Sequence, residues 1–202
     1  MTISRPGVFI NCPFDAEYEK SFQAIVFAIW ACGFKARCAL EISDAAETRI
    51  TKIERIIGDC RYGIHDISRT QLDEASQLPR FNMPLELGMF LGAKRFGDVE
   101  QRKKKALIFD SQAYRYQMFI SDLAGMDIIA HEDQPERIIA DVRHFLFSVS
   151  KRTSIPGPVQ LVQRYRDFVG ALPGLVELLD LEPDRIGFPD YERILMSWLS
   201  EV

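Results

Sequence analysis

Tyr62-Gly63-Ile64-His65-Asp66-Ile67-Ser68 is a short, mostly apolar run that ends in polar residues. Its length and its polar boundary are typical of a buried strand. Similar runs stand at Val8 to Ile10 and at Ala106 to Phe109, and longer amphipathic segments separate them. Because short apolar runs alternate with amphipathic segments, the sequence predicts βαβ units and a parallel sheet covered by helices.

Further elements are predicted on both sides of this run. We expect strands at 8–10, 34–40, 62–67, 106–109 and, with a weaker pattern, 127–130. Helices are expected at 17–32, 50–59, 82–91, 116–123 and 135–150, with Gly33 ending the first and Asn82 capping the third. This order of elements predicts an α/β, doubly wound, flavodoxin-like five-stranded parallel sheet.

The last quarter of the chain differs in pattern. Two prolines and a glycine in Thr153 to Pro158 predict a linker, so we expect an α/β domain over 1–152 and a helical tail over 153–202. Helical patches are expected at 159–169, 172–179 and 191–199. Such a short tail cannot bury a core of its own, so its apolar side chains are expected to pack on the α/β domain, on a second copy in a homodimer, or on a protein partner. These side chains are Leu178, Leu179, Leu181, Leu195 and Trp198.

Composition and charge exclude several classes of protein. Hydrophobic residues at 47% and charged residues at 27% are close to the average of a folded globular domain. With no apolar run of the roughly 20 residues that span a bilayer and no signal-peptide pattern, we expect a cytoplasmic protein without a membrane partner. A net charge of −4 gives no general attraction to nucleic acid, so direct nucleic-acid binding is not expected. Arg102 to Lys105 is interpreted as a solvated entrance to a strand.

The cysteines favour a reduced core over a metal centre. Cys12, Cys32, Cys38 and Cys60 are scattered through apolar sequence without C-x-x-C spacing. In a cytoplasmic setting such residues stay reduced and pack as small apolar side chains. The three histidines are too dispersed to change this, and no metal site is expected.

Polar residues follow the predicted strands at the point where ligands bind in open parallel sheets. They lie at Asn11 to Asp15, Glu41 to Asp44, Asp66 to Arg69, and Asp110. All four of these loops supply a carboxylate. The same residue types also suit turns, so each of them has a structural interpretation beside the functional one.

Glu86 interrupts an otherwise apolar helix, Asn82-Met83-Pro84-Leu85-Glu86-Leu87-Gly88-Met89-Phe90-Leu91-Gly92-Ala93. A carboxylate among so many apolar residues costs free energy unless a pocket or a partner receives it. The alternative is an exposed stripe that Glu86 shares with Asn82 and Lys94. The first interpretation makes Glu86 the leading candidate for chemistry.

Three segments in this order carry a resemblance. They are Val8-Phe9-Ile10-Asn11-Cys12-Pro13-Phe14, Tyr62 to Ser68, and Asn82 to Ala93 with Leu85-Glu86-Leu87-Gly88 at its centre. Together they resemble the nucleoside 2-deoxyribosyltransferase-like superfamily, and they are also similar to bacterial TIR-like domains, which cleave NAD through a glutamate on the corresponding helix. The resemblance covers about 7–130 and none of the tail. The strand-one loop departs from it, since Asn11-Cys12-Pro13-Phe14 replaces the usual Gly-Pro-Phe and lacks the Ser-rich opening common in TIR domains.

The resemblance implies an N-glycosidase that cleaves the bond between a ribose carbon and a base. Glu86 would attack or electrostatically support the sugar C1′, and Asp66 would hold a sugar hydroxyl or assist departure of the base, with the two carboxylates shifting each other's pKa. The other implied positions form a substrate-binding set. Asn11, Pro13 and Phe14 would shape the base pocket, Arg80 and Asn82 would receive a phosphate or a ribose hydroxyl, and Arg69 and Asp110 would assist.

The resemblance leaves substrate and role open. NAD, a nucleoside and a nucleoside 5′-phosphate all fit, as do hydrolysis and transfer, and no cofactor is expected beyond NAD as a possible substrate. TIR-like proteins often serve bacterial defence against phage, which makes an antiviral effector one expectation. The alternative is a non-catalytic nucleotide-binding or signalling module that recruits a partner through its helical tail.

Overall fold

The computed structural model describes residues 5–41, 44, 46–72 and 77–201. Five parallel strands form one sheet in the order β2-β1-β3-β4-β5. The strands are β1 Gly7–Asn11, β2 Lys35–Arg37, β3 Tyr62–Asp66, β4 Lys105–Asp110 and β5 Ile129–Ala130. This order is flavodoxin-like, so the predicted fold class is confirmed.

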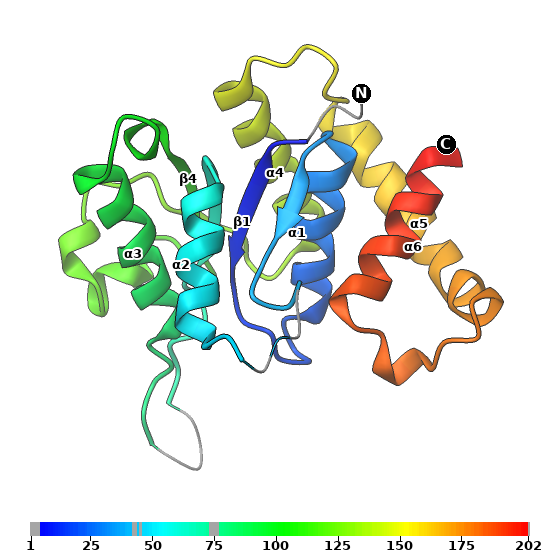
Figure 1. Ribbon diagram of the computed structural model, residues 1–202, viewed down its shortest axis with the longest axis horizontal. Coiled ribbons are helices and arrows are strands. Elements are labelled where there is room, and N and C mark those ends of the chain that lie inside the picture. Colours follow the sequence, from blue (N-terminus) through cyan, green and yellow to red (C-terminus); the bar gives the residue numbers. More distant parts are fainter. Residues whose placement is uncertain (1–4, 42–43, 45, 73–76, 202) are drawn as a thin grey trace.

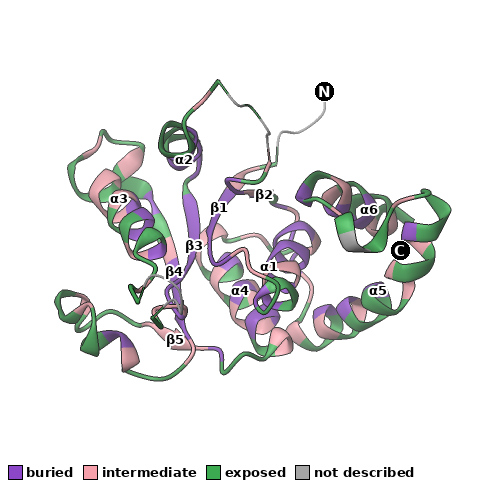
Figure 2. Cartoon of the chain, turned by 90° about the horizontal axis from the view of Figure 1, so that it is seen from below, coloured by how far each residue is buried: buried purple, intermediate pink, exposed green. Residues whose placement is uncertain are grey.

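Helices cover both faces of the sheet (Figures 1 and 2). The α-helices are α1 Glu19–Ala31, α2 Arg49–Asp59, α3 Asn82–Phe96, α4 Pro135–Ser150, α5 Pro158–Leu178 and α6 Phe188–Glu201. Short 3-10 turns stand at Gln101–Lys103, Arg115–Met118, Ser121–Leu123 and Pro183–Arg185. Helices α1 and α4 pack on one face and α2 and α3 on the other, which is the doubly wound arrangement.

Side chains of β1 alternate between the two faces. Val8 and Ile10 join the apolar cluster beneath α1 and α4, while Phe9 joins the cluster beneath α2. Because successive residues of a strand point to opposite faces, an uninterrupted apolar run is needed to fill both layers. This explains why the apolar runs of the sequence predict the strands well.

Several predicted boundaries are wrong. The second strand spans only Lys35–Arg37, because it is the edge strand and pairs with β1 alone. The predicted helix over 116–123 is two 3-10 turns, and the fifth strand is reduced to Ile129–Ala130. Asn82 is the first residue of α3 and not its N-cap; Phe81 takes that position without a side-chain bond. Helix α3 continues to Phe96, beyond the predicted end at Leu91.

The tail packs on the α/β layer and shares its core. Leu161, Phe168, Ile194 and Leu195 are buried in the same apolar cluster as α1 and α4. Figure 1 shows α5 and α6 beside α1, on the side of the sheet away from α2 and α3. Of the three packing possibilities for the tail, the structure therefore shows the first, although Leu178 is left 82% exposed.

Helix α5 is continuous where two helical patches were predicted. It runs from Pro158 to Leu178 with Pro173 inside it. A proline in a helix leaves the carbonyl four residues earlier without its bond. Pro173 is exposed and Val169 is 43% exposed, so the helix carries this proline at the protein surface.

Lys104 corrects the interpretation of the basic cluster. Arg102, Lys103 and Lys105 are exposed, as a solvated strand entrance requires, but Lys104 is buried. Its ammonium donates to the carbonyl oxygens of Ile57 and Cys60, at the end of α2. Cations bind the free carbonyls of a helix C-terminus in this way. The ammonium of Lys104 therefore links the end of α2 to the start of β4.

Candidate functional site

Glu86 lies on the inner side of α3. Its residue is 6% exposed, so the alternative of an exposed stripe is wrong. Burial raises the pKa of Glu86 to about 7, and the charge of Arg49 opposes that rise. Among the residues that the structure describes, none donates a hydrogen bond to this carboxylate, and the guanidinium of Arg49 lies 3.9 Å from Oε1. A carboxylate in this setting exchanges a proton near neutral pH.

Asn11 holds the first turn of α3 against the strand ends. Its amide nitrogen donates to the carbonyl oxygen of Met83 at 2.8 Å and to Nδ1 of His65 at 3.1 Å. Burial, aided by the charge of Lys104, lowers the pKa of His65 to about 3, so the ring is neutral and accepts this bond. Asn11 is 1% exposed. The structure therefore places it beneath the site, where it positions the helix that carries Glu86.

Asp66 is fully buried and bound by internal partners. Its Oδ2 accepts a hydrogen bond from Tyr18 Oη at 2.6 Å, and its Oδ1 accepts one from the amide of Ser68 at 2.8 Å. Nε2 of His131 lies 2.9 Å from Oδ2. Nδ1 of the same ring accepts from the amide of Asp133, so a neutral ring carries its proton on the side of Asp66. This carboxylate ties α1 and the end of β5 to β3.

The two predicted catalytic carboxylates share one neighbour. Burial raises the pKa of the Cys12 thiol, and the charges of Asp66 and Glu86 are both among the causes that raise it further. Glu86 itself is shifted by burial and Arg49 and not by Asp66. The mutual pKa shift predicted for the two carboxylates is therefore absent for Glu86.

Asp110 is also fully buried. Its Oδ1 accepts hydrogen bonds from Nε of Arg115 at 2.8 Å and from the amide of Ser111 at 2.7 Å. Arg115 also donates to the carbonyl oxygens of Ile67 and Ser68, so it joins the ends of β3 and β4. Asp110 has no exposed surface with which to meet a ligand, and its place is that of an anchor for Arg115.

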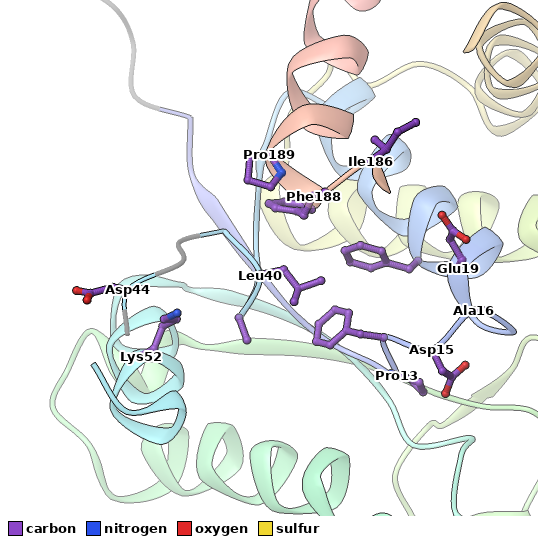
Figure 3. Close-up of a pocket in the computed structure, with 14 residues that line it drawn as sticks. Pro13, Asp15, Ala16, Glu19, Leu40, Asp44, Lys52, Ile186, Phe188 and Pro189 are labelled. Carbon is purple, nitrogen blue, oxygen red and sulfur yellow. The ribbon is translucent and has the colours of Figure 1, made fainter. Parts of the chain in front are cut away.

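Among the pockets that the described residues line, the one with the largest volume, about 670 Å³, opens at the ends of β1 and β2. Figure 3 shows its walls. Pro13 and Phe14 line it, whereas Glu86 and Asp66 do not. Arg49 connects the two places, because its guanidinium lies 5.8 Å from the ring centre of Phe14 and 3.9 Å from Glu86. The other lining residues are Asp15, Ala16, Glu19, Phe22, Ala39, Leu40, Asp44, Lys52, Ile186, Gly187, Phe188 and Pro189.

The predicted cationic positions lie along the same edge of the sheet. Arg80 pairs with Asp15 at 3.0 Å, and Arg69 pairs with Glu17 at 3.0 Å. Both arginines line a second pocket of about 540 Å³, which shares Asp15 and Ala16 with the largest one. Asn82 is exposed and lines neither pocket. An anion would have to compete with Asp15 and Glu17 for these arginines.

No protein-family model, curated protein or solved structure matches the chain. The resemblance to deoxyribosyltransferase-like and TIR-like proteins thus stays an expectation, and function has to be inferred from the site. Within the described ranges no three His, Cys, Asp or Glu side chains are grouped to hold a metal ion, and the four cysteines are buried and unbridged. No helix of the described part is long and apolar enough to cross a membrane.

Sequence reasoning missed Tyr18, Arg49, Arg115 and His131. The signal for His131 and Arg115 was present, because both follow predicted strands and the strand-end rule applies to them. Tyr18 and Arg49 stand at the starts of helices, and nothing in their local sequence indicates contact with Asp66 or Glu86.

Proposed function

We propose that this protein cleaves the N-glycosidic bond between the base and the ribose of a nucleotide-like substrate, with Glu86 as the reacting carboxylate. The observation that carries the proposal is the state of Glu86: it is 6% exposed and its pKa is raised to about 7. An ordinary structural glutamate would be hydrogen-bonded or solvated. A buried one without a hydrogen bond within the described residues is typical of a catalytic group.

The chemistry requires a carboxylate at the sugar carbon. As the base departs with the bonding electrons, positive charge develops at C1′ and on the ring oxygen. An ionised Glu86 beside C1′ either bonds to that carbon or stabilises the charge until water or another base attacks. With a pKa of about 7, roughly half of Glu86 is ionised at neutral pH, and turnover is expected to rise as it loses its proton.

Asp66 has a positioning role in this proposal. It is enclosed by Tyr18, Ser68 and His131 and has no exposed surface in the structure. Its charge fixes the end of β3, next to the loop after β1 that carries Phe14. NAD and nucleoside 5′-phosphates are the substrates to test, and NAD enters as a substrate and not as a cofactor.

The proposal is tested by following base release. Purified wild-type protein and the Glu86→Gln variant are incubated with NAD, nucleosides, 2′-deoxynucleosides and nucleoside 5′-phosphates, and the free base is measured by chromatography. Wild type is expected to release base from one of these, and Glu86→Gln is expected to be slower by on the order of 100-fold or more with its circular dichroism unchanged. Glu177→Gln, an exposed change on α5, is the matched control. Equal turnover by Glu86→Gln would end the proposal.

A second candidate is a non-catalytic nucleotide-binding module. It is favoured by the fact that the largest pocket is lined by neither Glu86 nor Asp66. This candidate predicts that the ligand binds and is recovered intact. The same incubation separates the two, because the binding module releases no base from any substrate.

A further inference from the structure

The largest pocket has walls from two parts of the chain. Phe14 and Leu40 come from the loops after β1 and β2. Ile186 and Gly187 precede α6 in the tail, and Phe188 and Pro189 are its first two residues. Figure 3 shows Phe188 and Pro189 facing Leu40 across the opening. The α/β layer alone would therefore leave this pocket without one of its walls.

The tail wall is held firmly in place. Tyr191 Oη donates to the carbonyl oxygen of Gln23 at 3.2 Å, and Trp30 Nε1 donates to Glu192 at 3.2 Å. Both bonds fasten the first turn of α6 to α1. Phe188 is 6% exposed, and its ring lies 5.8 Å from that of Phe22. The pocket is thus formed before any ligand arrives, as is usual for small-molecule sites.

Three phenylalanine rings line the pocket. Phe14 meets Phe22 edge to face at 5.2 Å, and Phe22 in turn packs against Phe188. Rings in such a row attract the face or the edge of another flat ring. The volume of about 670 Å³ lies within the common range of small-molecule sites, roughly 300–1,000 Å³.

The polar groups of the lining are mainly acceptors. Of the described residues around the pocket, Asp15, Glu19 and Asp44 carry carboxylates and Lys52 carries an ammonium. An ionised carboxylate accepts hydrogen bonds at about four sites and donates none. Asp15, Glu19 and Asp44 each accept bonds from the protein and keep further acceptor capacity. Because three carboxylates stand against the ammonium of Lys52 in this lining, donors on a ligand are favoured over oxo groups and over phosphate.

We propose that this pocket binds a planar aromatic heterocycle with an exocyclic amino group, and that Phe188 of the tail forms one wall of the site. The proposal rests on the proposed function in taking the heterocycle to be the base of the substrate. It adds that the site prefers a base with an exocyclic amino group to a base with an oxo group, and that the tail takes part in ligand binding.

Binding is measured by titration calorimetry in the Glu86→Gln protein, so that no ligand is consumed. Adenosine and inosine are the probes, because position 6 of the same ring carries an amino group in adenosine and an oxo group in inosine, whose neighbouring N1 also carries a proton. Adenosine is expected to bind roughly 10-fold more tightly or better, since an oxo group faces acceptor side chains. Millimolar inorganic phosphate is expected to leave adenosine bound. Displacement by phosphate, or equal binding of both nucleosides, would overturn the proposal.

The tail wall is tested separately. Phe188→Leu is expected to weaken adenosine binding by roughly 10-fold, while Phe147→Leu, on α4 and outside the pocket, leaves it unchanged. Should Phe188→Leu unfold, Ile186→Ala serves instead, because Ile186 lines the same wall and is only partly buried, and this variant is also expected to weaken adenosine binding. Its control is Met196→Ala, at an exposed position of α6 outside the pocket.

The outcomes separate the two proposals. If Phe188→Leu binds adenosine as tightly as the Glu86→Gln protein does, Phe188 is not a wall of the binding site. This result does not affect the proposal that Glu86 is the reacting carboxylate. Adenosine bound as expected, with no base released by wild type from any substrate, refutes cleavage and leaves the pocket assignment standing. A protein that binds neither nucleoside refutes the pocket assignment.

Discussion

Arg49 and Glu86 form a loose ion pair with 3.9 Å between guanidinium nitrogen and carboxylate oxygen. The arginine side chain is 53% exposed and that of the glutamate only 7%. Solvent screens the charge of Arg49, whereas the carboxylate has lost most of its hydration. Burial therefore outweighs the ion pair, and the pKa of Glu86 rises to about 7 instead of falling.

Removal of Arg49 is expected to raise the pKa of Glu86 further. The Arg49→Gln variant loses the one charge that lowers this pKa, so the ionised fraction at pH 7 falls. The pKa is read from a titration of the Glu86 carboxyl carbon by NMR, or from the pH profile of base release. Arg55→Gln is the control, since Arg55 stands on the same helix and pairs with Glu47. A pKa that stays near 7 in Arg49→Gln would show that Arg49 does not act on Glu86.

Glu86 is expected to make the fold less stable as pH rises. Its pKa is raised from 4.5 to about 7 in the folded protein. Between these values the unfolded chain has already released the proton that the folded chain retains, so stability falls with pH across this window. The loss is at most about 3 kcal/mol. Glu86→Gln cannot titrate and so lacks this loss. The free energy of unfolding of the variant, relative to that of wild type, is therefore expected to increase as the pH rises from 4.5 to 8.

Urea unfolding of both proteins at several pH values measures this difference, because the other titrating groups are common to both. Glu177→Gln, exposed on α5, is expected to follow the wild-type curve at every pH. Parallel curves for wild type and Glu86→Gln would mean that the pKa of Glu86 is the same in the folded and the unfolded protein, and the raised pKa would be withdrawn.

The sheet could be predicted because the amino acids of each strand depend on whether its two faces are buried. Val8 to Ile10 and Tyr62 to Asp66 are buried on both faces, so most of their residues are apolar, with His65 and Asp66 as the exceptions. The edge strand Lys35–Arg37 lacks this requirement, and its length was overestimated. The prediction that Glu86 is buried succeeded for the same reason, since its neighbours on α3 are apolar.

The partners of the site were not predictable from local pattern. Tyr18 and Asp66 are far apart in the chain. His131, which follows β5, contacts Asp66 at the end of β3 because only β4 lies between these two strands in the sheet. Such contacts depend on the order of strands in the sheet, which periodicity does not encode. The wall that Phe188 adds to the pocket has the same origin, because it depends on how the tail packs.

Tyr18→Phe is expected to destabilise the protein by about 1.5–3 kcal/mol, the usual range for a hydrogen bond to a charged group. The phenol donates to Asp66 at 2.6 Å, and both side chains are buried, so no water replaces the lost donor. Urea unfolding at pH 7 measures the effect. Tyr114→Phe is the matched control, as Tyr114 is 73% exposed. Equal losses in the two variants would show that the Asp66 bond contributes nothing specific.

Phe168→Ala is expected to destabilise the whole protein by about 3–5 kcal/mol, the range for truncating a buried phenylalanine. Phe168 belongs to the tail, yet it is fully buried and its ring stacks at 5.9 Å on Phe27 of α1. The neighbouring Val169 is 43% exposed, so Val169→Ala is the control and is expected to change stability little. A single unfolding transition that shifts as a whole in Phe168→Ala is the expected result, because tail and sheet share one core. Two transitions, with only the smaller one shifted, would show that the tail folds apart from the sheet, and Phe188 would then lose its support as a wall of the pocket.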